Sequence, residues 1–212
     1  MGLMAGCDPA LSTQLKFIVK YQGKALSCVG NSPLMWYLSN FQSKQIHTIK
    51  PSKFAQQQVA LMGANCLTEA WQLELNNQIS GTSLSFDLGV PWQLNHQNPL
   101  TASSPLNISE MFWSWQLGHK FLRFDGNEKF AFHLGSTGCK SASKLRAPKE
   151  PCRFPNRYRF TIESFDTNKP VIFDLDKLFN GVNKSQSCMS EQSNPVCQQL
   201  FSNLASSVFY QV

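Results

Sequence analysis

Residues 112–134 read FWSWQLGHKFLRFDGNEKFAFHL, and this segment decides the fold class. Residues 112–124 and 129–134 are rich in aromatic and branched apolar side chains, which favour β-strands. Between them, Asp125-Gly126-Asn127 is typical of the turn of a β-hairpin. The segment therefore predicts two antiparallel strands.

The hairpin also predicts which side chains lie near one another. Trp113 and Trp115 are two residues apart, so they are expected to share one face of the first strand. A turn centred near Gly126 would place His119 opposite His133 on the second strand. In the second strand, alternation places His133 on the face opposite its apolar neighbours.

Short apolar or alternating segments recur along the rest of the chain and predict more strands. They are residues 15–21, 34–38, 45–50, 58–61, 83–88, 157–165 and 170–175. Helical signals are few: one turn at Ser109, and a C-terminal helix capped by Asn194 with Pro195 at its first position. We expect an all-β fold, an antiparallel β-sandwich with long loops, three disulfides and a short C-terminal helix.

The length of 212 residues suits one domain. We expect residues 1–12 to be a tail with a signal remnant and residues 13–212 to form a single domain. The segment from Asn95 to Asn107, NHQNPLTASSPLN, is the longest predicted loop that no disulfide closes. Long ordered loops on a β scaffold are frequent sites of function.

The formal charge is +6, but only 15% of the residues are charged. The basic side chains concentrate at Lys140, Lys144, Arg146, Lys149, Arg153, Arg157 and Arg159. No nucleic-acid-binding motif accompanies them, so this region is expected to be a solvated loop or a surface for an acidic protein. No apolar run is long enough for a membrane helix, so a membrane is expected to hold the chain only through a lipid anchor.

Six of the seven cysteines form an even set, which indicates disulfides and an oxidising compartment. Fifteen pairings are possible in principle. Proximity in sequence favours Cys139–Cys152 and Cys188–Cys197, which leaves Cys28 to pair with Cys66.

Cys7 stands apart from the other cysteines. It ends the run Leu3-Met4-Ala5-Gly6-Cys7, which is similar to the end of a bacterial lipoprotein signal. The apolar and basic residues that precede such a cysteine are missing, so Cys7 is either the lipidated residue or a free thiol.

The common hydrolase, nucleotide and zinc-protease motifs are absent from the sequence, so the chain is not expected to be an enzyme. His96, His119 and His133 are the candidate metal ligands, since imidazole suits copper and zinc, and the methionines and aromatic residues favour soft Cu(I). The alternative is that they are structural groups, because no short ligand spacing joins them. Trp113 and Trp115 could likewise be core residues, a redox centre or a sugar-stacking platform.

Three segments together resemble the MbnP-like family of methanobactin-partner and CorA-like copper proteins. They are LGVPWQLNHQNPLTASSPLNISEMFWSWQLGHKFLRFD in the centre, FHLGSTGC followed by PCRFPNR, and CMSEQSNPVCQQLF near the C-terminus. The similarity runs from about residue 15 to about residue 204. The family commonly has Tyr after the glycine of its central motif, where this chain has His119 after Gly118. His119 is therefore either a third ligand or a neutral replacement.

The resemblance implies an exported copper-binding protein of the periplasm or outer membrane. His96 and His133 match the histidines of the family, and Trp113 and Trp115 match its Trp-x-Trp pair. In some members two histidines bind copper beside a tryptophan that is oxidised to kynurenine by a di-haem c-type cytochrome of the MauG and peroxidase group. We expect Cu(I) on His96 and His133, with binding that weakens below about pH 6, where imidazole becomes protonated.

Two alternatives remain at the level of sequence. The chain could be a docking module for a di-haem oxidase without an essential metal, with the basic segment 140–159 as its docking surface. It could instead be a carbohydrate-binding sandwich that uses exposed tryptophan faces.

Overall fold

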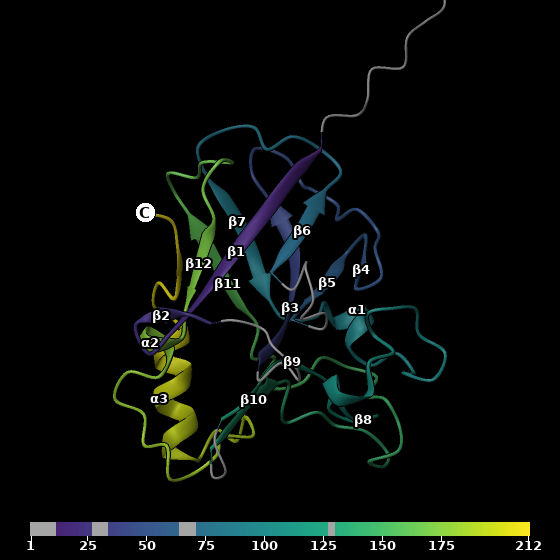
Figure 1. The fold of residues 1–212 in the computed structure, drawn as a ribbon. Helices are drawn as coiled ribbons and strands as arrows, with labels where there is room; N and C mark the ends of the chain where they lie inside the picture. Colours follow the sequence, from purple (N-terminus) through teal and green to yellow (C-terminus); the bar gives the residue numbers. More distant parts are fainter. Residues whose placement is uncertain (1–11, 27–33, 64–70, 127–129) are drawn as a thin grey trace, which may run out of the picture.

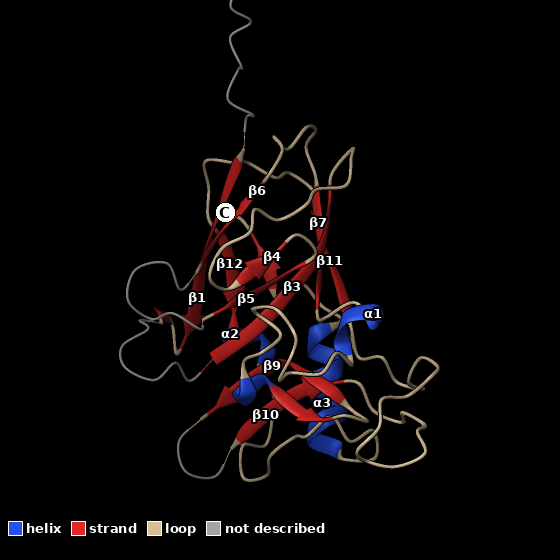
Figure 2. Ribbon diagram, turned by 90° about the vertical axis from the view of Figure 1, so that its right-hand side faces the viewer, coloured by secondary structure: helices blue, strands red, loops and turns tan. Residues whose placement is uncertain are grey.

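In the computed structural model, two packed β-sheets form the upper part of the molecule as drawn in Figures 1 and 2. The structure describes residues 12–26, 34–63, 71–126 and 130–212. The lower part holds β9 (Gly118–Asp125), β10 (Ala131–Gly135) and β8 (Phe112–Ser114), which extend the second sheet, together with helix α3 (Pro195–Leu204) (Figure 1). The candidate functional residues belong to this lower part.

The first sheet is built around strand β1, whose residues alternate between buried and exposed. In the described chain this sheet has five strands, in the order β13-β12-β1-β2, with β6 also paired to β1. The pairing of β1 with β12 is parallel, whereas its pairings with β2 and β6 are antiparallel. The strands are β1 Thr13–Tyr21, β2 Lys24–Ala25, β6 Gln72–Leu75, β12 Val171–Asp174 and β13 Phe209–Tyr210.

The second sheet is built around strand β3 and is antiparallel throughout. It has eight strands within the described residues, and β3 pairs with β5, β7 and β9. Its strands are β3 Leu34–Gln42, β4 Ala55–Gln56, β5 Val59–Met62, β7 Leu84–Leu88, β8 Phe112–Ser114, β9 Gly118–Asp125, β10 Ala131–Gly135 and β11 Tyr158–Ile162.

Phenylalanines fill the space between the two sheets. Phe173 of β12 contacts Trp36 of β3, with the ring centres 5.1 Å apart. Phe209 of β13 contacts Phe86 of β7 at 5.3 Å and Phe160 of β11 at 4.8 Å. Such aromatic pairs each contribute roughly 0.5–1.5 kcal/mol beyond the area that they bury. These contacts confirm a sandwich with an aromatic core.

Helices are short and few in the described chain. They are α1 Trp92–Asn95, α2 Leu175–Leu178 and α3 Pro195–Leu204, together with a single 3-10 turn at Ser109–Met111. The Asn194 side chain caps α3 by accepting hydrogen bonds from the backbone N–H groups of Val196 and Cys197, as the sequence predicts. None of these helices has the length and apolar character needed to span a membrane.

Four details of the predicted strands are wrong. Residues 112–124 do not form one strand: β8 ends at Ser114, and β9 begins at Gly118 after a turn. Trp115 lies in that turn, so it does not share a strand face with Trp113. Residues 45–50 form only isolated bridges, and within the described residues the sandwich contains one parallel strand pair, β1 with β12.

The predicted register of the β9–β10 hairpin is also wrong. His133 pairs with Arg123, and Ala131 pairs with Asp125, whereas a turn centred near Gly126 would pair His133 with His119. A bulge after Leu134 then shifts the pairing again. His119 therefore does not lie opposite His133.

Two predicted disulfides are present in the described residues. Cys139 bonds to Cys152, and Cys188 bonds to Cys197. The third predicted pair, Cys28–Cys66, lies outside the described residues, as does the predicted lipidation site Cys7.

Candidate metal centre

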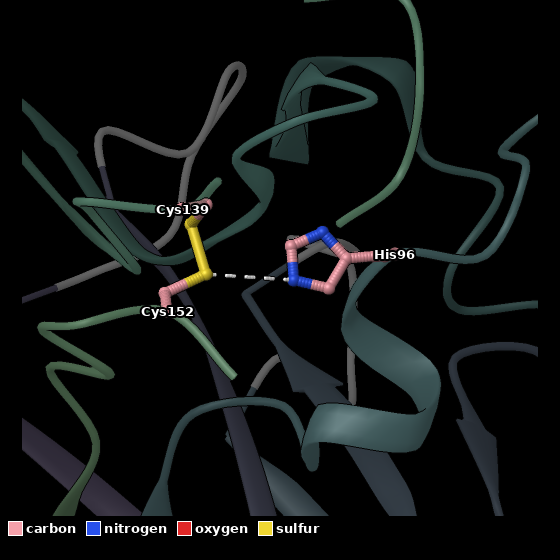
Figure 3. Close-up of side chains that lie close together, drawn as sticks. All are labelled: His96, Cys139 and Cys152. Atoms are coloured by element: carbon pink, nitrogen blue, oxygen red, sulfur yellow. Dashed lines mark hydrogen bonds between the residues drawn. A yellow bond between two sulfur atoms is a disulfide. The ribbon is translucent and has the colours of Figure 1, made fainter. Parts of the chain in front are cut away.

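His96 follows helix α1 directly and faces a disulfide (Figure 3). Its Nε2 atom lies 3.8 Å from the Sγ atom of Cys152. On the helix side, its ring packs edge-on against Trp92, with the ring centres 4.6 Å apart. The one-turn helix thus positions the imidazole between an aromatic ring and the sulfur atoms.

The neighbouring hydrogen bonds assign the protonation state of His96. The Asn95 side-chain oxygen accepts from the backbone N–H of His119 at 2.9 Å, which fixes the orientation of the amide. The amide nitrogen of Asn95 is then a donor, and it lies 3.2 Å from His96 Nε2. In the neutral imidazole, Nε2 therefore carries the lone pair and Nδ1 carries the proton.

Burial lowers the pKa of His96 to about 4, and the nearby His119 acts in the same direction. The Trp115 carbonyl opposes this shift, although Nδ1 makes no hydrogen bond of normal geometry. His96 is therefore neutral at pH 7, which is the form that binds a metal.

His133 lies on β10, on the face opposite the buried Phe132 and Leu134, as predicted. Its Nε2 atom lies 2.8 Å from Asp125 Oδ1, and Arg123 forms an ion pair with the same carboxylate at 2.5 Å. Since a carboxylate accepts, Nε2 donates and Nδ1 carries the lone pair. Burial lowers the pKa of His133 even though Asp125 raises it.

His119 is fully buried, and both of its ring nitrogens face backbone carbonyl groups. Nδ1 lies 2.7 Å from the oxygen of Asn95, and Nε2 lies 2.9 Å from the oxygen of Leu106. These carbonyl groups are near the two ends of the predicted 95–107 loop, so the imidazole holds the loop ends on strand β9. A metal on His119 would require one of these contacts to break.

Gly118 allows the loop to approach strand β9 this closely. Its φ angle is +78°, and a Cβ atom there would lie 2.4 Å from the carbonyl oxygen of Asn95. Asn95 in turn binds His119 and lies beside His96. The backbone at Gly118 thus positions both histidines.

The segment from Trp113 to Trp115 lies near both predicted copper ligands. The Trp113 ring lies 6.4 Å from that of His133, and the Trp115 carbonyl interacts with His96. Trp113 also packs on Gly135, where a Cβ atom would lie 2.7 Å from the indole. His96 and His133, both described, share no hydrogen bond or ring contact.

In the described chain, one group of three or more side chains has the composition and spacing for a metal. It consists of His96, Cys139 and Cys152, whose ligand atoms all lie within 4.8 Å of one another. Both sulfur atoms are engaged in the disulfide, so neither is a thiolate ligand in this state. Sequence reasoning paired these cysteines correctly but missed that they contact His96, because 56 residues separate His96 from Cys152.

The basic segment is divided between two environments. Arg157 and Arg159 form ion pairs with Asp87 of strand β7 at 2.6 and 3.0 Å, so both side chains are held on the second sheet. The remaining basic residues of the segment are exposed and lie in or beside the loop that the Cys139–Cys152 disulfide closes: Lys140, Lys144, Arg146, Lys149 and Arg153.

Comparison with known proteins identifies relatives of the chain. A model of the MbnP family matches residues 10–198. Among solved structures, MbnP from Methylosinus trichosporium is similar with a TM-score of 0.72 and 22% sequence identity, over 90% of this chain and 87% of that one. No curated protein sequence matches the chain. At this identity the solved structure supports the fold, whereas the family match covers most of the sequence.

Proposed function

The chain belongs to the MbnP family, and on that premise we propose that it is an exported copper-binding protein, not an enzyme, in which His96 and His133 hold Cu(I). One observation carries the proposal: each imidazole has one unprotonated nitrogen while its other nitrogen keeps the proton, and in His96 that nitrogen, Nε2, would exchange its contact with the Asn95 amide for the metal. In His133 that proton is held by Asp125, as is usual for metal-binding histidines.

The donor set suits a soft ion. Two neutral imidazoles with aromatic neighbours and no carboxylate ligand favour Cu(I) over hard cations. His96 would bind through Nε2 and His133 through Nδ1. When bound, copper would supply redox chemistry beside Trp113, while the protein's residues orient the rings and exclude water. His119, whose nitrogens both face carbonyl groups, keeps a structural role in this proposal.

Cu(I) competition between the protein and a chromogenic chelator tests the assignment. We expect about one copper per chain, lost in the His96→Ala/His133→Ala double variant and weakened at least about tenfold in each single variant. His47→Gln is the matched control, because His47 contacts Ser43 and lies outside the proposed site. A double variant that kept full copper would refute the proposal.

The proposal includes a di-haem c-type cytochrome that oxidises Trp113 or Trp115. Both indoles are partly exposed, whereas Trp36 is fully buried in the core. Protein made without the partner should keep every tryptophan unmodified, and co-expression should change the mass of a peptide that contains Trp113 or Trp115. Modification of Trp36, Trp71 or Trp92 instead would contradict this part.

One observation favours the second candidate, a docking module without an essential metal. The exposed basic loop at 140–153 lies beside His96, because the disulfide at its base contacts the imidazole. An acidic face on the partner would bind such a loop, and the binding would weaken with salt. If binding of the cytochrome survives removal of copper and the His96→Ala/His133→Ala change, docking is the primary function.

Location in the periplasm or at the outer membrane, with Cys7 as a lipid anchor, completes the proposal. Intact-mass measurement of natively expressed protein would report the anchor, the disulfides and any oxidised tryptophan together.

A further inference from the structure

The disulfide beside His96 places two sulfur atoms where ligands could stand. Figure 3 shows the imidazole edge directed at the sulfur atom of Cys152, which is bonded to that of Cys139. The three potential ligand atoms lie within 4.8 Å of one another, and Nε2 carries the lone pair. Two thiolates and one imidazole form a soft donor set of three, which suits Cu(I).

We propose that reduction of the Cys139–Cys152 disulfide creates a second Cu(I) site, formed by both thiolates and His96 Nε2. This inference goes beyond the function proposed above, because the site uses no residue of strand β10. The two sites share His96, so they are alternatives. The redox state of one disulfide then selects which of them holds copper.

The base of the loop keeps the two cysteines together after the S–S bond breaks. Thr137 and Phe154 exchange backbone hydrogen bonds of 2.9 and 3.0 Å, and the N–H of Arg153 donates to Gly138 at 3.3 Å. These bonds flank Cys139 and Cys152, just outside the loop that the disulfide closes. The Gln116 side chain also donates to the Cys139 carbonyl at 3.0 Å. None of these contacts depends on the disulfide.

The rest of the loop can move without disturbing the sheets. The hydrogen bonds within it are local, such as that from the N–H of Arg146 to Ser143, and most of its residues are exposed. Both cysteines are about nine-tenths buried or more, with exposures of 7% and 6%. Movement of the loop is therefore the route by which a reductant reaches the sulfur atoms.

A dithiol is the class of reductant proposed for this step. One of its thiolates attacks a sulfur of the disulfide, the Cys139–Cys152 bond breaks, and a mixed disulfide forms. The second thiol of the reductant then displaces the remaining cysteine. Two electrons pass to the protein, the reductant leaves as a disulfide, and both cysteines gain protons. Binding of Cu(I) releases those two protons, since thiolates are the ligands.

The test uses the His133→Ala variant, in which the site proposed for the oxidised protein has lost one of its two ligands. We would measure Cu(I) affinity by chelator competition, without oxygen, before and after treatment with a phosphine reductant that is then removed. Reduction should tighten Cu(I) binding at least tenfold relative to His133→Ala/Cys139→Ser/Cys152→Ser, which keeps every other thiol. Adding His96→Gln should weaken the gained binding about tenfold.

Alkylation followed by peptide mass analysis gives a second readout that does not depend on the serine variant folding. Cu(I) should protect Cys139 and Cys152 together in reduced His133→Ala protein. Equal alkylation with and without Cu(I), or equal affinity in the serine variant, would overturn the inference. An unweakened Cu(I) affinity of oxidised His133→Ala protein would instead count against the His96–His133 proposal alone.

Discussion

The two disulfides of the described chain each have a candidate copper ligand as a neighbour, but in different ways. Cys188 is fully buried and pairs through its backbone with β10, where its carbonyl accepts from the N–H of His133 at 2.9 Å. Cys152 lies at the base of an exposed loop and contacts His96 through its sulfur. The first disulfide fixes a backbone, whereas the second presents its sulfur atoms to a side chain.

The difference teaches that loop length does not decide the role of a disulfide here. The two bonds close loops of similar size, with sequence separations of 9 and 13 residues. The chain-entropy model gives each about 3 kcal/mol, with little difference between them. Any difference between the two disulfides in stability or chemistry must therefore come from how deeply each is buried and which residues it contacts.

The largest expected effect is the loss of stability when each disulfide is removed. Replacing Cys188 and Cys197 together by alanine should lower the free energy of unfolding by about 4 kcal/mol. The change removes two buried sulfur atoms and the disulfide that joins helix α3 to the segment paired with β10. The matched Cys139→Ala/Cys152→Ala variant should lose about 2 kcal/mol. Urea unfolding measures both, and equal losses would show that chain entropy alone governs the two bonds.

A second prediction compares the contributions of His119 and His133 to stability. His119→Ala should cost about 3 kcal/mol, since it empties a fully buried site and removes the N–H donor of the neutral ring from the Asn95 or Leu106 carbonyl group that accepts it. His133→Ala removes a partly exposed ring and should cost under about 1 kcal/mol by the same measurement. A small loss for His119→Ala would mean that the loop ends are held by other contacts.

The smallest effect concerns pH. Burial lowers the pKa of His96 to about 4, whereas an unfolded histidine has a pKa of about 6.5. Between these values the unfolded state binds more protons, so the stabilisation present above about pH 6.5 is lost as the pH falls toward 4.

Thermal unfolding of metal-free protein measures this loss. For this partly exposed group we expect a contribution of about 1 kcal/mol, or about 3 °C in Tm. His96→Gln, which cannot gain a proton, should flatten the Tm profile between pH 6.5 and 4. An unchanged profile would assign the pH dependence to the other histidines, whose pKa values burial also lowers.

Local sequence patterns predicted most of the strands because each buries one face. Strand β1 is the clearest case, with Leu15, Phe17 and Val19 buried on one side. The four-residue helices α1 and α2 could not be predicted, since one turn shows no period. The turn at Trp115 was not predicted either. Gly118, which has a positive φ angle, is the residue in the sequence that could have indicated it.

The candidate site could be predicted only in part. The disulfide of Cys139 with Cys152 followed from proximity in sequence, and the face of His133 followed from alternation. The contact of His96 with Cys152 depends on how two distant loops pack, which no local pattern records. The predicted hairpin register was wrong because it assumed a turn centred on Gly126, whereas His133 pairs with Arg123.

The parallel pairing of β1 with β12 has a consequence for how the chain is made. Lys20 and Asp174, which lie side by side, are 154 positions apart in sequence. At about 5–20 residues per second, a ribosome needs roughly 8–30 s after Lys20 to reach Asp174, its neighbour in the sheet. Throughout that interval one edge of the first strand stays open to other chains, and the lysines at positions 16 and 20 are the kind of charge that discourages such pairing. Nascent chains stalled before residue 171 should therefore be the species most in need of a chaperone.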